Sequence, residues 1–318
     1  MFLEKGFLPA NKFWKYLVGS LIIIIASTIG QIPLGIAVLI KAFETGKPFP
    51  KTETEIMTFL PLNTTLFLLL FSFVFAFIAI ILVVKYFHRQ TFLSVTTSRQ
   101  KVDWKRILFS FSLWGIFTIV STLILFYSSP ESFVLNFKLI PFLILAIIGI
   151  FLIPIQTSTE EYVFRGYLMQ GFAILGKNRW FPLVMTSLIF GTMHIANPEV
   201  AKLGYIVLVY YIGTGFFLGI ITLMDEGMEL ALGFHAANNL VTALLVTSDW
   251  SAFQTHSIFK DVSSPSAGLE ILVPIFIIFP MLLFIFSKKY NWSDWKEKLT
   301  GDINIETIKP NKNVGSNE

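Results

Sequence analysis

The chain has 318 residues, of which 54% are hydrophobic and only 14% are charged. Soluble domains usually carry about 25% charged residues, so this composition favours an integral membrane protein. The formal charge of +4 is modest. The chain contains no cysteine, which excludes disulfides, thiol nucleophiles and cysteine-based metal sites. The sequence carries no nucleic-acid-binding signature, and we expect no nucleic-acid partner.

Eight apolar segments approach the roughly 20 residues that a helix needs to cross the hydrocarbon core. We therefore predict an all-α, polytopic transmembrane bundle of about eight spanning helices. Residues 1–136 would form an N-terminal three-helix membrane region, 137–287 a membrane core, and 288–318 a polar cytoplasmic tail that is disordered at its end. The eight segments are 13–41, 57–85, 106–128, 137–157, 180–197, 204–224, 228–248 and 268–287.

The distribution of Lys and Arg predicts the orientation, because these residues accumulate on the cytoplasmic side of membrane proteins. We predict a multi-pass protein of the inner or plasma membrane with both termini in the cytoplasm. The loop from Lys85 to Arg106, with six basic residues, would lie against anionic membrane lipid. This orientation places 18 of the 24 basic residues in the inner segments 1–15, 85–106, 158–180, 225–229 and 288–318.

Ionisable groups inside a membrane protein are costly and mark candidate functional sites. The first candidate is the run TEEYVFRG at 159–166. On a helix, Glu161 and Arg165 lie one turn apart with the acid first, the favourable order for an ion pair. Glu160 is offset from Glu161 by about 100° and can face elsewhere. One carboxylate would then be neutralised while the other remains available for chemistry. The alternative is a helix end with a capping acid and a surface salt bridge.

Two further candidates each pair a histidine with a neighbour at i, i+4 spacing. Phe190 and His194 share one helix face, and His235 and Asn239 share another within segment 228–248. The structural alternative for His194 is a packed side chain bonded to a backbone carbonyl. For Asn239 the alternative is an interhelical hydrogen bond that only holds the bundle together.

The remaining ionisable residues of interest fall in connecting segments. His88 lies in the basic loop and His256 in a polar outer loop, so we expect both to be solvated. Asp225, Glu226 and Glu229 form an acidic turn between two spans, which we interpret as a cytoplasmic connection.

A carboxylate, two histidines and an amide suit the hydrolysis of a peptide bond without a covalent intermediate. Glu160 would act as the general base on a water molecule, and a histidine would position that water or protonate the leaving amine. Asn239 would donate to the developing oxyanion. In an alternative arrangement Glu160, His194 and His235 would bind Zn²⁺ and leave one position open for water. The chain has no HExxH, which excludes a zincin-type helix.

The motifs EExxxR, FxxxH and HxxxN occur in this order at 160–165, 190–194 and 235–239. Their order and spacing resemble the Abi or CPBP family, which comprises CAAX prenyl endopeptidases of the Ras-converting type and bacteriocin-processing or immunity relatives. The resemblance covers roughly 137–248. It implies an eight-helix intramembrane peptidase with a cavity open to the cytoplasm, in which 137–287 is the catalytic core. The substrate would be a membrane-associated or lipidated peptide or protein.

The resemblance implies six site residues: Glu160, Glu161, Arg165, His194, His235 and Asn239. Glu160 would activate the water with His194 as its partner, and His235 with Asn239 would serve the oxyanion. The other two residues would support the site. No cofactor is assigned by the sequence, and zinc stays open as an alternative. Two other functions also stay open: a non-catalytic bacteriocin-immunity or peptide-binding protein, and a less favoured proton-coupled transporter.

The depths predicted for these residues conflict. His194 lies about 14 residues, or ~21 Å, from the cytoplasmic start of its helix, but His235 only about seven residues, or ~10 Å. Glu160 is predicted to be shallower still. The three converge only if the helix of Glu160 continues segment 137–157 with a kink or tilt, or if the span boundaries differ. Pro154 offers a place for such a kink.

Overall fold

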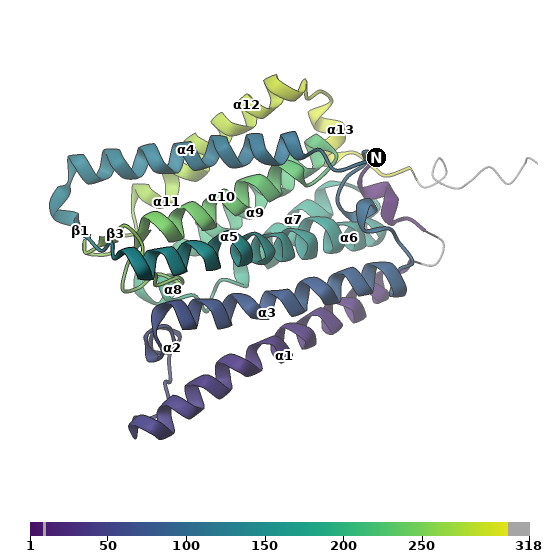
Figure 1. Cartoon of the computed structure of the whole chain (residues 1–318). Helices are drawn as coiled ribbons and strands as arrows, with labels where there is room; N and C mark the ends of the chain where they lie inside the picture. Colours follow the sequence, from purple (N-terminus) through teal and green to yellow (C-terminus); the bar gives the residue numbers. More distant parts are fainter. Residues whose placement is uncertain (9–10, 305–318) are drawn as a thin grey trace, which may run out of the picture.

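The computed structural model describes residues 1–8 and 11–304, and these residues are almost entirely helical (Figure 1). Within them, six helical runs are long and apolar enough to cross a membrane, so the chain is an integral multi-pass membrane protein. The predicted all-α polytopic fold is confirmed. The six runs are Phe13–Thr45, Leu62–Phe87, Trp104–Ser128, Leu139–Gly176, Val207–Asp225 and Ile271–Tyr290.

Long helices form the bundle and short ones connect or cap it. The bundle helices are α1 (Phe13–Thr45), α3 (Leu62–Leu82), α4 (Trp104–Ser128), α5 (Leu139–Glu161), α6 (Met169–Gly176), α7 (Trp180–Thr192), α9 (Val207–Asp225), α10 (Glu229–Leu245) and α12 (Phe279–Tyr290). The short helices are α2 (Glu53–Phe59), α8 (Pro198–Leu203), α11 (Leu269–Val273) and α13 (Trp295–Thr300). The 3₁₀ and π turns are η1 (Leu3–Gly6), η2 (Val83–Phe87), η3 (Phe92–Val95), η4 (Pro130–Ser132), η5 (Tyr162–Leu168) and η6 (Pro274–Ile278).

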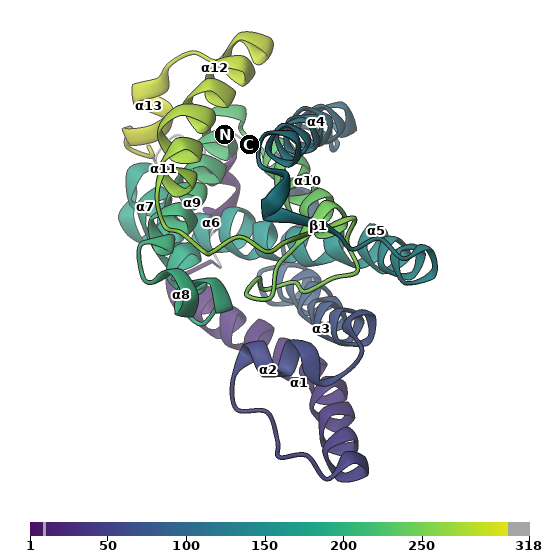
Figure 2. The same ribbon diagram turned by 90° about the vertical axis from the view of Figure 1, so that its left-hand side faces the viewer.

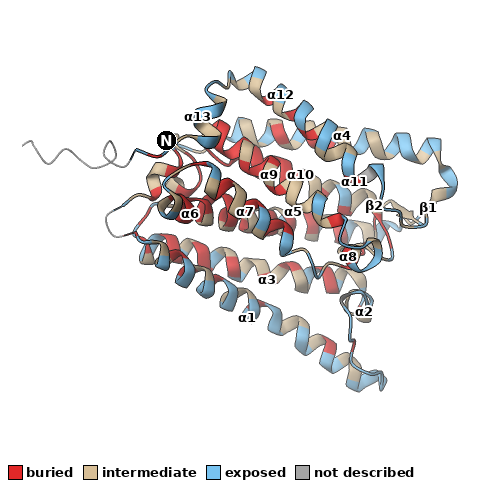
Figure 3. Ribbon diagram, turned by 180° about the vertical axis from the view of Figure 1, so that it is seen from behind, coloured by how far each residue is buried: buried red, intermediate tan, exposed pale blue. Residues whose placement is uncertain are grey.

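The expected count of about eight spans is not confirmed, because two of the predicted spans are short helices inside the protein. Helix α7 has 13 residues and α10 has 17, fewer than the roughly 20 that cross the hydrocarbon core. Helix α7 packs against α9, and α10 packs against both α4 and α5 (Figure 2). Neighbouring protein covers these helices, so their length need not match the bilayer. Figure 3 shows the contrast between the buried α9 and α10 and the largely exposed α1.

Helices α5 and α6 form one continuous run of 38 residues from Leu139 to Gly176, joined by the π-helical turn η5. The prediction that the span ends at 157 is therefore wrong. Pro154 lies inside α5 and does not end it. The polar side chains that follow Pro154 find partners within the bundle, so the helix continues through them. Single π turns of this kind often occur at functional sites.

A small three-stranded sheet closes the end of the bundle opposite the N-terminus (Figure 1). Strand β3 (Phe259–Asp261) is central, with β1 (Phe133–Leu135) antiparallel on one side and β2 (Val246–Thr247) parallel on the other. The register pairs Val134 with Lys260. This sheet links the end of α4, the start of α5 and the end of α10.

The other end of the bundle is closed by the N-terminal segment, the loop after η2 and the segment after α12. Both termini of the described chain meet at Arg179, which donates its backbone N–H to the Gly301 carbonyl at 3.1 Å and lies 3.5 Å from the Glu4 carboxylate. The disorder predicted for the end of the tail concerns residues 305–318, which lie outside the described residues. The earlier part of the tail forms α13, whose Lys298 donates to the Met224 carbonyl at 3.0 Å.

Candidate active site

Glu160 and Glu161 stand at the end of α5 and occupy different environments. The Glu161 side chain is fully buried and pairs with the equally buried Arg165 at 3.0 Å. This ion pair confirms the one predicted from the i, i+4 spacing. Glu160 faces another direction, and its side chain is 19% exposed. A charged side chain without water requires a partner, so Glu161 is held by Arg165 while Glu160 remains accessible.

The two glutamates lie on either side of His235, which projects from α10. The Nδ1 atom of His235 is 2.8 Å from Glu161 Oε1, and its Nε2 is 3.6 Å from Glu160 Oε2. Because a carboxylate paired with arginine accepts hydrogen bonds, Nδ1 carries the proton shared with Glu161. The Nε2 atom therefore faces the accessible carboxylate. The spacing of HxxxN on α10 did not reveal that the two glutamates enclose this ring.

Gln156 also belongs to the site, although the sequence motifs did not include it. Its side chain lies one turn before Glu160 on α5, is 4% exposed, and donates from Nε2 to Glu160 Oε1 at 2.5 Å. Its Oε1 accepts from Asn239 Nδ2 at 3.1 Å. Asn239, expected at the oxyanion, thus holds Gln156 in this structure. The sequence does carry one signal for Gln156, because it is a polar residue in an apolar segment, four positions before the candidate base Glu160.

His194 follows α7 and is not part of this group of contacts. Its Nδ1 is 2.7 Å from the Phe190 carbonyl oxygen, and its ring stacks on Tyr211 with centroids 4.2 Å apart. Among the described residues, no hydrogen bond or ion pair joins it to Glu160 or His235. The Nε2 atom of His194 has no hydrogen-bond partner among the described residues. The contact with a backbone carbonyl that is expected of a merely packed histidine is therefore present. The Nε2 atom of His194 remains available to a ligand.

Phe190 packs between the two halves of the site. Its ring centroid is 4.3 Å from the Arg165 guanidinium, 4.8 Å from the His194 ring and 6.1 Å from the His235 ring. A cation over an aromatic face is attracted by the ring quadrupole. Phe190 thereby covers the buried ion pair and separates the two histidines.

The set proposed for zinc does not fit a metal ion in this arrangement. A catalytic zinc site brings three side-chain ligands to within about 2 Å of one point. Among the described residues, no group of three His, Cys, Asp or Glu side chains is placed to hold a metal. Both ring nitrogens of His235 face the two glutamates, and His194 bonds elsewhere. We therefore assign no step of peptide-bond hydrolysis to zinc.

The depth conflict is resolved by the continuation of the Glu160 helix to Gly176. Met228, at the start of α10, lies beside this run, where a side chain built on Gly166 would approach Met228 Sδ to 3.3 Å. Gly166 is ten residues, or ~15 Å, before the end of α6. The start of α4 lies level with the start of α10, because the Asp103 backbone N–H donates to Glu229 at 3.3 Å. The continuous run therefore places Glu161 deep enough to meet His235.

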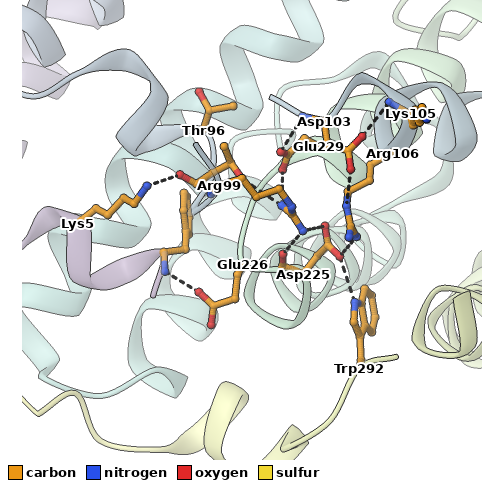
Figure 4. A network of polar contacts seen from close by, with 12 residues as sticks. Lys5, Thr96, Arg99, Asp103, Lys105, Arg106, Asp225, Glu226, Glu229 and Trp292 are labelled. Atoms are coloured by element: carbon orange, nitrogen blue, oxygen red, sulfur yellow. Dashed lines mark hydrogen bonds and ion pairs between the residues drawn. The ribbon is translucent and has the colours of Figure 1, made fainter. Parts of the chain in front are cut away.

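One basic residue from the loop before α4 and one from the first turn of α4 neutralise the acidic α9–α10 turn (Figure 4). Arg99 pairs with Asp225 at 3.0 Å and with Glu229 at 3.1 Å. Arg106 forms a second ion pair with Asp225, and Trp292 donates its indole N–H to the same carboxylate at 3.1 Å. These two arginines therefore bind protein carboxylates instead of lying against lipid as predicted. The acidic turn is a buried connection.

Comparison with known proteins identifies a family for the region that holds these residues. The model of the family described as "Type II CAAX prenyl endopeptidase Rce1-like" matches residues 138–241, which include all six predicted site residues. The chain is 30% identical over 244 residues to the uncharacterized protein YyaK of Bacillus subtilis (strain 168), a match that covers 76% of this chain and 81% of that protein. No solved structure matches the chain significantly.

Proposed function

Because the chain belongs to the Rce1-like family of type II CAAX prenyl endopeptidases, we propose that it hydrolyses a peptide bond in a membrane-associated or lipidated peptide, using a water molecule activated by Glu160. The observation that carries this proposal is the pairing of an accessible carboxylate with an oriented histidine. Glu160 Oε2 faces His235 Nε2 at 3.6 Å, and the buried Glu161 holds the opposite ring nitrogen.

The chemistry follows from these positions. Glu160 removes a proton from water as the water oxygen attacks the peptide carbonyl carbon. His235, whose proton is on Nδ1, accepts a hydrogen bond at Nε2 from the attacking water and orients it, while Glu161 holds the ring in this tautomer. Glu160 returns its proton to the amine as the C–N bond breaks. His194, whose Nε2 has no partner among the described residues, would contact the substrate.

The location within the cell is part of the same proposal. The positive-inside distribution places the end of the bundle that carries the N-terminus and α13 in the cytoplasm. The contacts of Arg179 with Glu4 and Gly301 support it, because they put both ends of the described chain on one side. We therefore propose that both termini lie in the cytoplasm.

Cleavage by the purified protein tests this function. The wild type in detergent would be incubated with fluorogenic peptides, prenylated and unprenylated. We expect Glu160→Gln to lower kcat/KM by about 10²–10⁴-fold, the range typical of a general base. His235→Ala and His194→Ala should also lose activity. His256→Ala, which removes a histidine outside the site, serves as the control. Cleavage that all three site variants retain would contradict the assignment. Binding of peptide by the wild type without cleavage would favour a peptide-binding or immunity role.

A further inference from the structure

A chain of four hydrogen bonds leads from α4 to Glu160. Trp114 Nε1 donates to Asn238 Oδ1 at 3.1 Å, and Asn238 Nδ2 donates to Asn239 Oδ1 at 3.0 Å. Asn239 Nδ2 donates to Gln156 Oε1 at 3.1 Å, and Gln156 Nε2 donates to Glu160 Oε1 at 2.5 Å. Every bond in this donor chain runs in the same direction, from the indole toward the carboxylate.

The indole at the start of the donor chain fixes this direction. An amide side chain can donate from its nitrogen or accept at its oxygen, but an indole N–H can only donate. Asn238 must therefore turn its oxygen to Trp114 and its nitrogen to Asn239. Asn239 must then accept at its oxygen and donate from its nitrogen. The same holds for Gln156, whose nitrogen must face Glu160. Trp114 is 7% exposed and packs on the Phe234 ring at 4.5 Å, which limits its reorientation.

The donor chain ends at an oxygen that must accept. The hydrogen bond from Gln156 fixes which oxygen is occupied, because Oε1 is bonded to Gln156 while Oε2 faces His235 Nε2 at 3.6 Å. Glu160 is thereby held with one oxygen directed to the place where a water would be deprotonated.

We propose that Trp114 and Gln156 are positioning residues that keep the Glu160 carboxylate oriented as the base. This inference rests on the proposed peptidase function. Trp114 lies on α4, outside the region 138–241 that matches the family, so the donor chain links the site to a helix of the N-terminal region. Neither residue touches the substrate, and both act through the Glu160 carboxylate.

The separation of kcat from KM tests the inference, because a base held out of position lowers kcat while substrate binding is kept. Gln156→Met keeps the length of the side chain and removes the donor. We expect kcat to fall by about tenfold, the effect of losing one hydrogen bond, with KM unchanged. Trp114→Phe keeps a ring in place and should lower kcat by a smaller factor.

Two matched controls isolate the donor chain. Trp292→Phe removes an indole N–H from a carboxylate outside the site, since Trp292 bonds to Asp225 at 3.1 Å. Thr157→Val changes a fully buried neighbour of Gln156 that bonds only to carbonyls of its own helix, at 3.1 Å to Ile153. Neither control should lower kcat. A kcat that is unchanged in both Gln156→Met and Trp114→Phe would overturn the inference.

A readout independent of cleavage separates this inference from the proposed function. The indole N–H resonance of Trp114, assigned by its loss in Trp114→Phe, should shift in Gln156→Met, which breaks the donor chain, and keep its position in Thr157→Val. A shift of this kind in a protein without cleavage would support the donor chain and contradict the peptidase. A signal that does not respond to Gln156→Met would overturn the donor chain, whatever the protein cleaves.

Discussion

Replacement of Arg99 by methionine is expected to destabilise the end of the bundle that carries the N-terminus, because two buried carboxylates lose a shared partner. Arg99 donates to Glu229 Oε2 at 3.1 Å, to Asp225 Oδ2 at 3.0 Å and to the Asp225 carbonyl at 2.7 Å. Asp225 keeps its second partner, Arg106. The fully buried Glu229 carboxylate keeps only the Asp103 backbone N–H at 3.3 Å.

The magnitude follows from the burial of the group that is left unpaired. Removing one partner of a buried ion pair typically costs about 3–5 kcal/mol. The Arg99 side chain is 25% exposed, so water can partly replace it. We therefore expect the lower end of that range, about 3 kcal/mol. For a chain of this size, this loss corresponds to a decrease in Tm of roughly 6 °C.

Thermal unfolding of the detergent-purified variants measures this loss. Lys101→Met removes the same charge from an exposed position in the same loop and should leave the Tm unchanged. The double variant Arg99→Met with Glu229→Met removes the unpaired acid as well and should be more stable than Arg99→Met alone. A Tm for Arg99→Met equal to that of Lys101→Met would refute the reasoning, as would a double variant at least as unstable as the single one.

Three further outcomes are expected. Burial and the nearby Lys15 lower the pKa of His88 to about 4, from about 6.5 in the unfolded chain. The unfolded state then binds the proton first, so stability should fall by up to about 3 kcal/mol from pH 6.5 to 4, and unfolding of His88→Gln should lack this slope. Gly191→Ala would place a Cβ 2.8 Å from the Ile212 backbone and should lower the Tm by overpacking, whereas Gly35→Ala, with open space around it, should not. Chelators should leave the cleavage rate unchanged, and a loss of activity that added zinc restores would contradict this.

Local spacing was sufficient to predict the parts of the site that lie on one helix. Glu161 and Arg165 are one turn apart in any α-helix, so their ion pair follows from the sequence. The bundle itself follows from composition and from long apolar segments. Gln156 was missed because its role depends on Asn239, 83 positions away, and no local pattern carries that contact.

Tertiary contacts also explain the predictions that were wrong. His88 was expected to be solvated because its neighbours are polar and basic. In the structure it is 1% exposed, with Nδ1 3.0 Å from Asn11 Oδ1 and Nε2 2.8 Å from the Tyr167 hydroxyl. Such partners compensate the cost of burying a polar ring, but they come from two other parts of the chain. A hydropathy profile registers the polar residue but not the distant residues that bind it.

The charge cluster and the site depend on one another through the position of α10. The start of α10 lies level with the start of α4, because the Asp103 backbone N–H donates to Glu229 at 3.3 Å. Arg99 and Arg106 neutralise Asp225 and Glu229 within the protein, which permits the turn to lie beside Gly166. His235 is six residues, or ~9 Å, further along α10. That distance brings its ring to Glu161 in the middle of the 38-residue helical run. Basic residues from outside the family match are therefore a condition for assembling the histidine with the two glutamates.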